Sequence, residues 1–421
     1  MTARVSWAEA AGQAVRAGLR PSRLAINGGN AVRTTAMPSW PFFDDADLES
    51  AREVLASGRV NYWTGDHGRA FESEFAAAVG TEHAVAVSNG TVALELALRA
   101  LGVDRGTEVV VPAATFIATA SAVVACGGVP VVADVDPLSG CVTADTVAAV
   151  LTERTVAVVV VHLGGHPVDM DTVVALARSR GLFVVEDCAQ AHGARYRGRS
   201  VGSLGDIATW SFCQDKILTT AGEGGAITTS DDELWRRCWE AKDHGKSWSA
   251  VHQRPRTAGF RWLHESFGTN ARMTEVQAAI GRNQLRKLDG WVGRRRANAR
   301  VLLGALRSEP AVRLVEPPAD VEHAYYRFLA HLRPERLAEG WDRDRVVSAV
   351  QAEGVPCQQG GCMEIYRERA FDTVPGRPVE LPAAAELGRN AFVLLTHPTL
   401  TAFDMADTAD AVRKVLAEAT A

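Results

Sequence analysis

The sequence predicts an α/β fold with a large, mostly parallel sheet, followed by a smaller C-terminal α+β domain. Between residues 80 and 230, short β-branched runs alternate with helix-compatible segments, which is the rhythm of an α/β sheet domain. The runs are almost continuously apolar, as expected when helices cover both faces of a parallel sheet. Beyond about residue 315 the pattern changes to separate strand-like and helical stretches, which indicates a second domain.

The first part of the chain is expected to supply the sheet. Strands are predicted over residues 83–88, 108–112, 129–134, 156–162 and 182–186, with two shorter ones at 207–212 and 226–229. The helix-compatible segments between them are residues 91–101, 115–126, 144–151 and 170–179. Ahead of the sheet, the Ala-rich residues 1–20 predict a helix. Residues 30–75 carry Gly, Trp and Pro in irregular order and predict loops folded over a site.

The second part is expected to begin with a long helix over residues 273–306, broken near Asp289 and Gly290. A strand over 325–332, a helix over 343–353 and a last helix from Ala406 follow. We therefore expect a large α/β domain with an N-terminal arm over residues 1–295 and a small α+β domain over 296–421.

The composition narrows the class of protein. The 421 residues are 47% apolar and 23% charged, and the net charge of −5 gives no reason to expect nucleic acid as a partner. No apolar run reaches the length of a membrane span, so no membrane partner is expected either. The seven cysteines form no CxxC pair, which favours reduced thiols in a cytoplasmic protein. No metal site is expected.

The first chemical motif is Ser88-Asn89-Gly90-Thr91, where a strand runs into a helix. Small residues at this position let the N–H groups of a helix N-terminus face an anion, and Thr91 adds a hydroxyl. A plain strand-to-helix turn capped by Thr91 explains the same residues.

The second motif, EDCAQAHG (186–193), directly follows an apolar strand. A carboxylate at the C-terminal end of a parallel strand lies where α/β proteins bind ligands. Asp187 could keep a heteroaromatic ring nitrogen protonated, and Gln190 lies within reach of the same place. We expect Glu186 to be structural, and for His192 a structural role competes with a role in the site.

The third motif is SFCQDK (211–216), followed by AGEGG (221–225). The chain has only five lysines, and Lys216 lies between a strand and a glycine-rich turn. A lysine there is costly to bury unless it pairs or reacts, and a lysine that forms an imine is a standard way to activate a carbonyl cofactor. Taken alone, such a lysine also fits an ordinary surface residue.

Together these motifs resemble the DegT/DnrJ/EryC1/StrS sugar aminotransferases, which are fold-type I pyridoxal-phosphate (PLP) enzymes of the aspartate aminotransferase class. The resemblance extends from Asn27 to about Leu400. Its most specific pieces are VSNGTVAL (87–94), EDCAQAHGA (186–194), SFCQDK with GEGG (211–225) and GTNARMTEVQAAIG (268–281).

The resemblance implies a role for each matching position. Lys216 would hold PLP as a Schiff base and move the proton, while Asp187 would pair with the pyridine nitrogen. The other cofactor contacts that it implies are Gly90, Thr91 and Ser211 at the phosphate, Phe116 stacked on the ring, Gln190 at the phenolic oxygen, and Asn270 reaching the partner's phosphate across a homodimer.

The implied reaction moves an amino group from glutamate or glutamine to a keto sugar, most directly a nucleotide-linked one. A keto-cyclitol or another secondary-metabolite ketone is the close alternative, and a PLP lyase or dehydratase that keeps its lysine is a second. An inactive PLP-binding regulator is a non-enzymatic alternative, which the intact Asp187 and Lys216 argue against. Ala221 makes the loop after Lys216 one residue longer than the common family pattern, so substrate contacts there do not transfer.

Acceptor contacts are expected from Tyr62, His244, Lys246 and Tyr366. Tyr62 belongs to a Tyr-Trp-Thr segment, and Lys246 with Lys242 flanks His244, so the two lysines could meet a diphosphate. An exposed charged loop is the alternative for these lysines. Further candidate walls are the segments 261–264 and 358–361.

Overall fold

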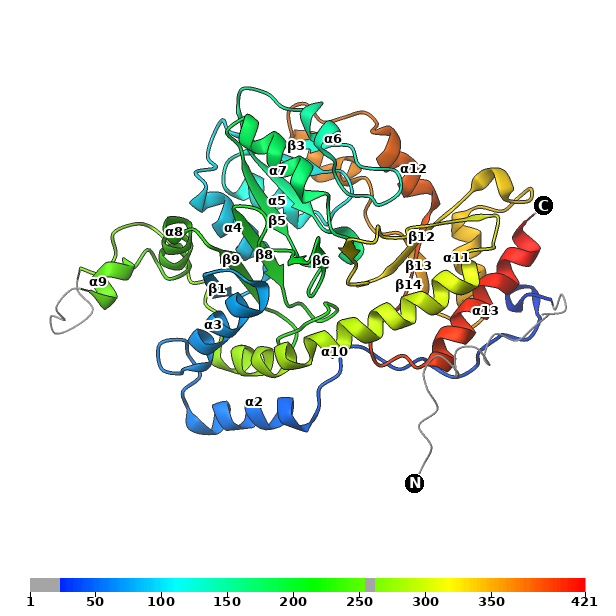
Figure 1. Ribbon diagram of the computed structural model, residues 1–421, viewed down its shortest axis with the longest axis horizontal. Helices are drawn as coiled ribbons and strands as arrows, with labels where there is room; N and C mark the ends of the chain where they lie inside the picture. Colours follow the sequence, from blue (N-terminus) through cyan, green and yellow to red (C-terminus); the bar gives the residue numbers. More distant parts are fainter. Residues whose placement is uncertain (1–22, 254–261, 421) are drawn as a thin grey trace.

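The computed structural model describes residues 23–253 and 262–420 and has a seven-stranded sheet at its centre (Figure 1). The strand order is β1-β9-β8-β5-β4-β2-β3, in which β2 to β5 and β8 run parallel and β9 runs antiparallel to both β1 and β8. The strands are β1 (His83–Val87), β2 (Glu108–Pro112), β3 (Val129–Ala133), β4 (Thr155–Val161), β5 (Phe183–Asp187), β8 (Ile207–Ser211) and β9 (Gly225–Thr229). The predicted α/β class and all seven strands are confirmed, each within one or two residues.

Helices pack on this sheet and join its strands. They are α3 (His67–Val79), α4 (Gly90–Ala100), α5 (Ala118–Ala125), α6 (Ala144–Ala148), α7 (Met170–Ser179) and α8 (Asp232–Lys242). The strands are buried along nearly their whole length, because β2 and β8 have no exposed residue and β4 only one that is half-buried. This two-sided burial accounts for their continuously apolar sequences.

Two expectations about helices are wrong. Residues 30–75 contain α2 (Asp45–Ser57) and most of α3, where loops were expected; α2 has a capping box between Asp44 and Asp47 and ends at Gly58 in the left-handed region. The long helix α10 (Glu275–Leu306) passes through Asp289 and Gly290 without a break. The helix expected over residues 1–20 lies outside the described residues.

The C-terminal part forms a four-stranded antiparallel sheet of order β10-β12-β14-β13, with β10 (Val312–Leu314), β12 (Phe328–Leu332), β13 (Cys357–Gln359) and β14 (Ala391–Leu394). Its helices are α11 (Arg343–Ala352), α12 (Pro382–Asn390) and α13 (Ala402–Ala419). A three-stranded ribbon joins β6 (Arg195–Tyr196), β7 (Arg199–Ser200) and β11 (Val321–Glu322). The short α9 (Trp248–His252) follows α8 along the chain and lies beyond it at the left of the view (Figure 1).

Helix α10 runs from the large sheet to the small one along one side of the molecule (Figure 1). Its N-terminal part, up to Val292, contributes Ala278 and Val292 to the core around the large sheet. Ala299, Leu302 and Leu306 belong to a second core with α11, α13 and the small sheet. The domain boundary at residues 295 and 296 stays a prediction. Among the described residues, no helix is long and apolar enough to cross a membrane.

Candidate active site

The candidate residues lie at one edge of the large sheet. Strands β4, β5 and β8 are parallel, and β1 has the same direction as β8 because β9 is antiparallel to both. The residues that follow Val87, Asp187 and Ser211 therefore emerge at the same edge, where open α/β sheets bind ligands. This geometry brings together motifs that are more than 100 residues apart in the sequence.

The N-terminus of α4 forms an anion cradle. Asn89 caps the helix by accepting the Val92 N–H at 2.9 Å, and the N–H groups of Gly90 and Thr91 have no partner among the described residues. A Cβ atom on Gly90 would lie 2.7 Å from the Ser211 Cβ, so only glycine lets the end of β8 approach the helix this closely. Two N–H groups, the Thr91 hydroxyl and the Ser211 hydroxyl thus converge on one place, as in phosphate sites at helix N-termini.

Asp187, the last residue of β5, is buried at the floor of the site. Its carboxylate accepts the Ala189 N–H at 3.1 Å and faces the Thr119 hydroxyl at 3.4 Å. Burial raises the pKa of Asp187, and the opposing effects of the Ala189 N–H and the Lys216 ammonium do not offset it. A cationic N–H donor placed against this carboxylate would restore the ionised form.

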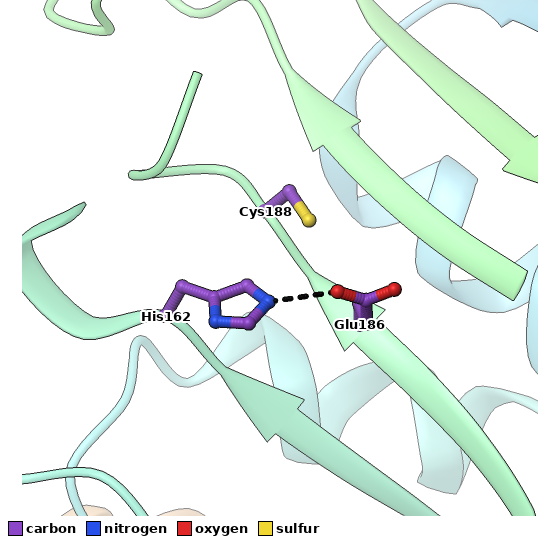
Figure 2. Close-up of side chains that lie close together, drawn as sticks. All are labelled: His162, Glu186 and Cys188. Atoms are coloured by element: carbon purple, nitrogen blue, oxygen red, sulfur yellow. Dashed lines mark hydrogen bonds and ion pairs between the residues drawn. The ribbon is translucent and has the colours of Figure 1, made fainter. Parts of the chain in front are cut away.

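The neighbouring Glu186 points to the other side of the strand and is structural, as expected. Figure 2 shows it beside His162 and Cys188, three residue types that could hold a metal. The carboxylate already accepts three main-chain N–H groups, from Gly202, Leu204 and Gly205 at 2.7–2.8 Å, and His162 Nε2 lies at 3.0 Å. Because His162 Nδ1 accepts the Val168 N–H, Nε2 carries the ring hydrogen and donates a hydrogen bond to Glu186. These hydrogen bonds occupy the carboxylate and both imidazole nitrogens.

Lys216 follows β8 and lies at the wall of the cavity, with 17% of its side chain exposed. Its ammonium is 3.9 Å from the Asp215 carboxylate and 5.0 Å from the centre of the Tyr326 ring. The Tyr326 hydroxyl donates to Asp215, and Arg327 lies 3.6 Å from the same carboxylate. Burial would raise the pKa of Asp215, but Lys216, Tyr326 and Arg327 together hold it below its ordinary value.

These groups border one cavity of about 800 Å³. The cavity is lined by the expected cofactor residues Gly90, Thr91, Phe116, Asp187, Gln190, Ser211 and Lys216, and by the candidate wall Gln358, Gln359, Gly360 and Gly361. The Gln190 side-chain oxygen accepts the Gly164 N–H at 2.7 Å, so the NH₂ group of this amide remains to donate to a ligand.

The other predicted site residues do not line this cavity. Asn270 is exposed, opposite Asp243 in a short backbone bridge, and His244 is exposed beside it. Tyr62 is buried and donates to Glu72 at 2.9 Å, and Tyr366 is buried and donates to Glu364 at 2.8 Å. A ligand in the cavity of the same chain is therefore not in contact with them.

The two lysines of the 242–246 segment have partners within the chain. Lys242 is fully buried, lies 2.9 Å from Glu72 and stacks on Tyr62, so the idea that it meets a diphosphate is wrong. Lys246 pairs with the buried Asp243 at 3.0 Å. Of the third candidate segment, Arg261 lies outside the described residues, and residues 262–264 do not line the cavity.

Two further expectations concern residues next to the cofactor motifs. The extra residue of the loop after Lys216, Ala221, is exposed and has a φ of 66°, so the loop absorbs it in a left-handed conformation. His192 is buried against Trp210 and Phe212, and burial lowers its pKa to about 3. His192 is therefore a neutral ring packed below the site.

No sequence pattern indicated that Asp215, Tyr326 and Arg327 belong to the site. Asp215 adjoins the lysine, but nothing in the motif identifies its partner. Tyr326 and Arg327 come from a segment more than 100 residues later, where the sequence predicts only a strand. Tyr325 has a positive φ, the strand begins only at Phe328, and the two residues between them line the cavity.

Comparisons with a family profile and with individual relatives identify the same kind of protein, an aminotransferase. The sequence profile of the DegT/DnrJ/EryC1/StrS aminotransferase family matches residues 42–413. The chain is 35% identical to L-glutamine:2-deoxy-scyllo-inosose aminotransferase of Micromonospora echinospora, over 93% of this chain and 96% of that protein. It is 38% identical to dTDP-3-amino-3,4,6-trideoxy-alpha-D-glucose transaminase of Streptomyces venezuelae, over 90% and 96%.

Solved structures agree with the sequence comparison. The fold superposes on an aminotransferase from Psychrobacter cryohalolentis with a TM-score of 0.89 and 47% identity, covering 91% of this chain and 99% of that one.

Proposed function

Because the chain belongs to the DegT/DnrJ/EryC1/StrS aminotransferase family, we propose that it uses PLP to move an amino group from glutamate or glutamine to the ketone of a sugar. The observation that carries the proposal is the single cavity that joins Lys216 and the buried Asp187 to the anion cradle of Gly90 and Ser211. Each of these groups suits one part of PLP: an aldehyde, a ring nitrogen and a phosphate.

The residues of the cavity fit the cofactor in detail. The N–H groups of α4 and the Ser211 hydroxyl would hold the phosphate. Burial raises the pKa of Asp187, and the protonated ring nitrogen would donate to its carboxylate and stabilise the ionised form. The free NH₂ group of Gln190 would donate to the phenolic oxygen, and Phe116, which is 67% exposed within the cavity wall, would cover the ring face. When bound, PLP supplies the electron sink that stabilises negative charge at the reacting carbon.

Lys216 would then carry the proton. In the first half-reaction its amino group removes the proton from the Cα of the amino donor, and in the second it delivers a proton to the former carbonyl carbon of the acceptor. Asp187 keeps the ring nitrogen protonated throughout, which the first step requires. Asp215 and Tyr326 hold the lysine side chain near the cavity wall.

We propose a nucleotide-linked keto sugar as the acceptor, in a homodimer in which Asn270 reaches the phosphate site of the partner subunit. The relatives include a transaminase whose name gives a dTDP-linked sugar, and Asn270 is exposed rather than directed into its own cavity. A keto-cyclitol is the second candidate. It is favoured by the burial of Lys242, which removes one of the two lysines expected for a diphosphate, and by the amides of Gln358 and Gln359, which suit a ring of hydroxyl groups.

The test is a two-step reaction with purified protein. PLP is added, then glutamate or glutamine, and release of the keto acid is measured together with the absorbance of the cofactor. The aminated protein is next offered dTDP-linked keto sugars and 2-deoxy-scyllo-inosose in parallel. Lys216→Ala should abolish the first step. Lys287→Ala should leave it unchanged, because Lys287 lies on α10 and pairs with Asp44 and Asp47. No keto acid from any amino donor would refute the aminotransferase proposal.

A further inference from the structure

The main chain of Lys216 is held by a residue far away in the sequence. The indole N–H of Trp40 donates to the Lys216 carbonyl oxygen at 2.9 Å. Trp40 precedes the 42–413 segment that the family profile matches. It also stacks on His397 with ring centres 6.3 Å apart and meets Trp291 edge-on at 5.0 Å. The N-terminal segment, α10 and the C-terminal part of the chain thus meet behind the lysine.

A buried arginine lies over the Trp40 ring. The guanidinium carbon of Arg295, on α10, lies 5.2 Å from the centre of the Trp40 ring, and the side chain has no exposed surface. No carboxylate of the described residues forms an ion pair with it, and its Nε and Nη2 atoms have no hydrogen-bond partner there. A buried cation without an anion destabilises a core that a methionine of similar size would fill. Packing alone therefore does not account for an arginine at this position.

The hydrogen bonds of Arg295 lead to the tyrosine beside the Lys216 amino group. Its Nη1 atom donates to the main-chain oxygens of Tyr326 at 3.3 Å and of Tyr325 at 3.5 Å. Tyr326 is buried, its ring lies 5.0 Å from the Lys216 ammonium, and its hydroxyl donates to Asp215. Arg295 therefore supports both groups that flank Lys216: Trp40 at the carbonyl and Tyr326 beside the amino group.

We propose that Trp40 and Arg295 are positioning residues for Lys216, with Arg295 fixing Trp40 by stacking and Tyr326 by hydrogen bonds to its main chain. The proposal rests on the proposed function, because it takes Lys216 as the reactive group. It adds that the orientation of this lysine depends on Trp40 in the N-terminal segment and on Arg295 in α10. Neither of these residues lines the cofactor cavity.

The test compares two substitutions with matched controls. Trp40→Phe removes the N–H donor and keeps an aromatic ring. Trp291→Phe is its control, since Trp291 meets the Trp40 ring edge-on whereas the N–H that binds the Lys216 carbonyl belongs to Trp40. Arg295→Met removes the stacked cation. Arg296→Met is its control, because Arg296 lies next to it on the same helix and binds Glu322 and the His323 carbonyl instead.

Three quantities are measured on each PLP-loaded variant: the bound cofactor, its visible circular dichroism per bound molecule, and the single-turnover rate of amino transfer across a range of glutamate concentrations. Trp40→Phe and Arg295→Met should change the dichroism and lower the rate at saturating glutamate about tenfold, the equivalent of one net hydrogen bond. The glutamate concentration for half-saturation should stay within about twofold, because neither residue lines the cavity. Both controls should match the wild type.

Wild-type dichroism and rate in Trp40→Phe would overturn the proposal, even if Arg295→Met does not fold. Equal losses in Trp291→Phe and Trp40→Phe would also overturn it, because they would show general packing rather than a specific contact. If the wild type reacts with PLP and glutamate, and the variants have the same dichroism and rate, only this inference is overturned. A wild-type protein that forms no imine with PLP overturns the proposed function as well.

Discussion

Gly90→Ala is the sharpest test of the anion cradle. The new Cβ would lie 2.7 Å from the Ser211 Cβ, whereas ordinary contacts begin at 3.4 Å, so α4 and β8 must separate by about 0.7 Å. A hydrogen bond of about 2.9 Å that lengthens by this amount passes the limit for a useful bond. Losing one charge-assisted bond of about 1.5–3 kcal/mol weakens PLP binding about 10- to 150-fold.

The assay is titration of cofactor-free protein with PLP, followed by absorbance. Gly304→Ala in α10 is the matched control, because nothing lies within 4 Å of its Cβ and alanine favours a helix. This control should bind PLP as the wild type does and unfold at an equal or higher denaturant concentration. If Gly90→Ala binds PLP with wild-type affinity, the phosphate does not lie at the start of α4 and the reasoning fails.

Three further predictions concern the lysine loop, the ring partner and the buried histidines. Ala221→Gly should raise the free energy of unfolding by about 0.5–1 kcal/mol in urea titrations, because glycine adopts a φ of 66° without strain; an unchanged or lower value contradicts this. Asp187→Asn should still form the imine with Lys216 but transfer amino groups about 10- to 1000-fold more slowly in single turnovers, since the ring nitrogen loses its anionic partner. Without cofactor the same variant should be more stable than the wild type at pH 8 and lose that advantage toward pH 4, because the raised pKa of Asp187 makes the native state hold a proton that the unfolded state releases. Burial lowers the pKa of His192 to about 3 and of His331 and His397 to about 4. The unfolded chain therefore binds protons below about pH 6.5 that the native state does not. The urea concentration at the unfolding midpoint should decrease as the pH is lowered from about 6.5 to about 5, and a midpoint that does not change with pH would contradict this.

The strands of the large sheet were predictable because each is buried on both faces. A continuous apolar run such as Val156–Val161 leaves little choice of structure when helices cover both sides. The same reasoning placed Asp187 and Ser211 at strand ends, and the sheet order then brought them together. Local sequence was therefore enough to place these two residues at strand ends, whereas their expected roles came from the family resemblance.

The N-terminal helices were missed for a local reason. Residues 30–75 contain glycine, tryptophan and proline, which favour loops, but Asp44 and Asp47 form a capping box at the start of α2 and Gly58 ends it. Helix α10 was expected to break at Gly290, but a glycine in a helix costs only about 1 kcal/mol. Packing of the two halves of α10 on two cores stabilises the helix by more than this.

The surroundings of Lys216 depend on tertiary structure that no local pattern encodes. Trp40 and Tyr326 contact it directly, and Arg295 acts through both of them. Each of the three looks ordinary in its own segment. A tryptophan before a proline, an arginine in a charged helix and a tyrosine before a strand carry no signal of a shared contact. Only tertiary packing, in which α10 runs along one side of the molecule from the large sheet to the small one, brings these residues together around one lysine.

The central claim is that Lys216 binds PLP covalently, and borohydride reduction followed by peptide mass spectrometry tests it most directly. The chain has four other lysines, at positions 242, 246, 287 and 414, which serve as internal controls. We predict that one PLP per chain is fixed on the peptide that contains Lys216 and that Lys216→Ala carries none. Label on another lysine with Lys216 unmodified, or no label at all, would contradict the account.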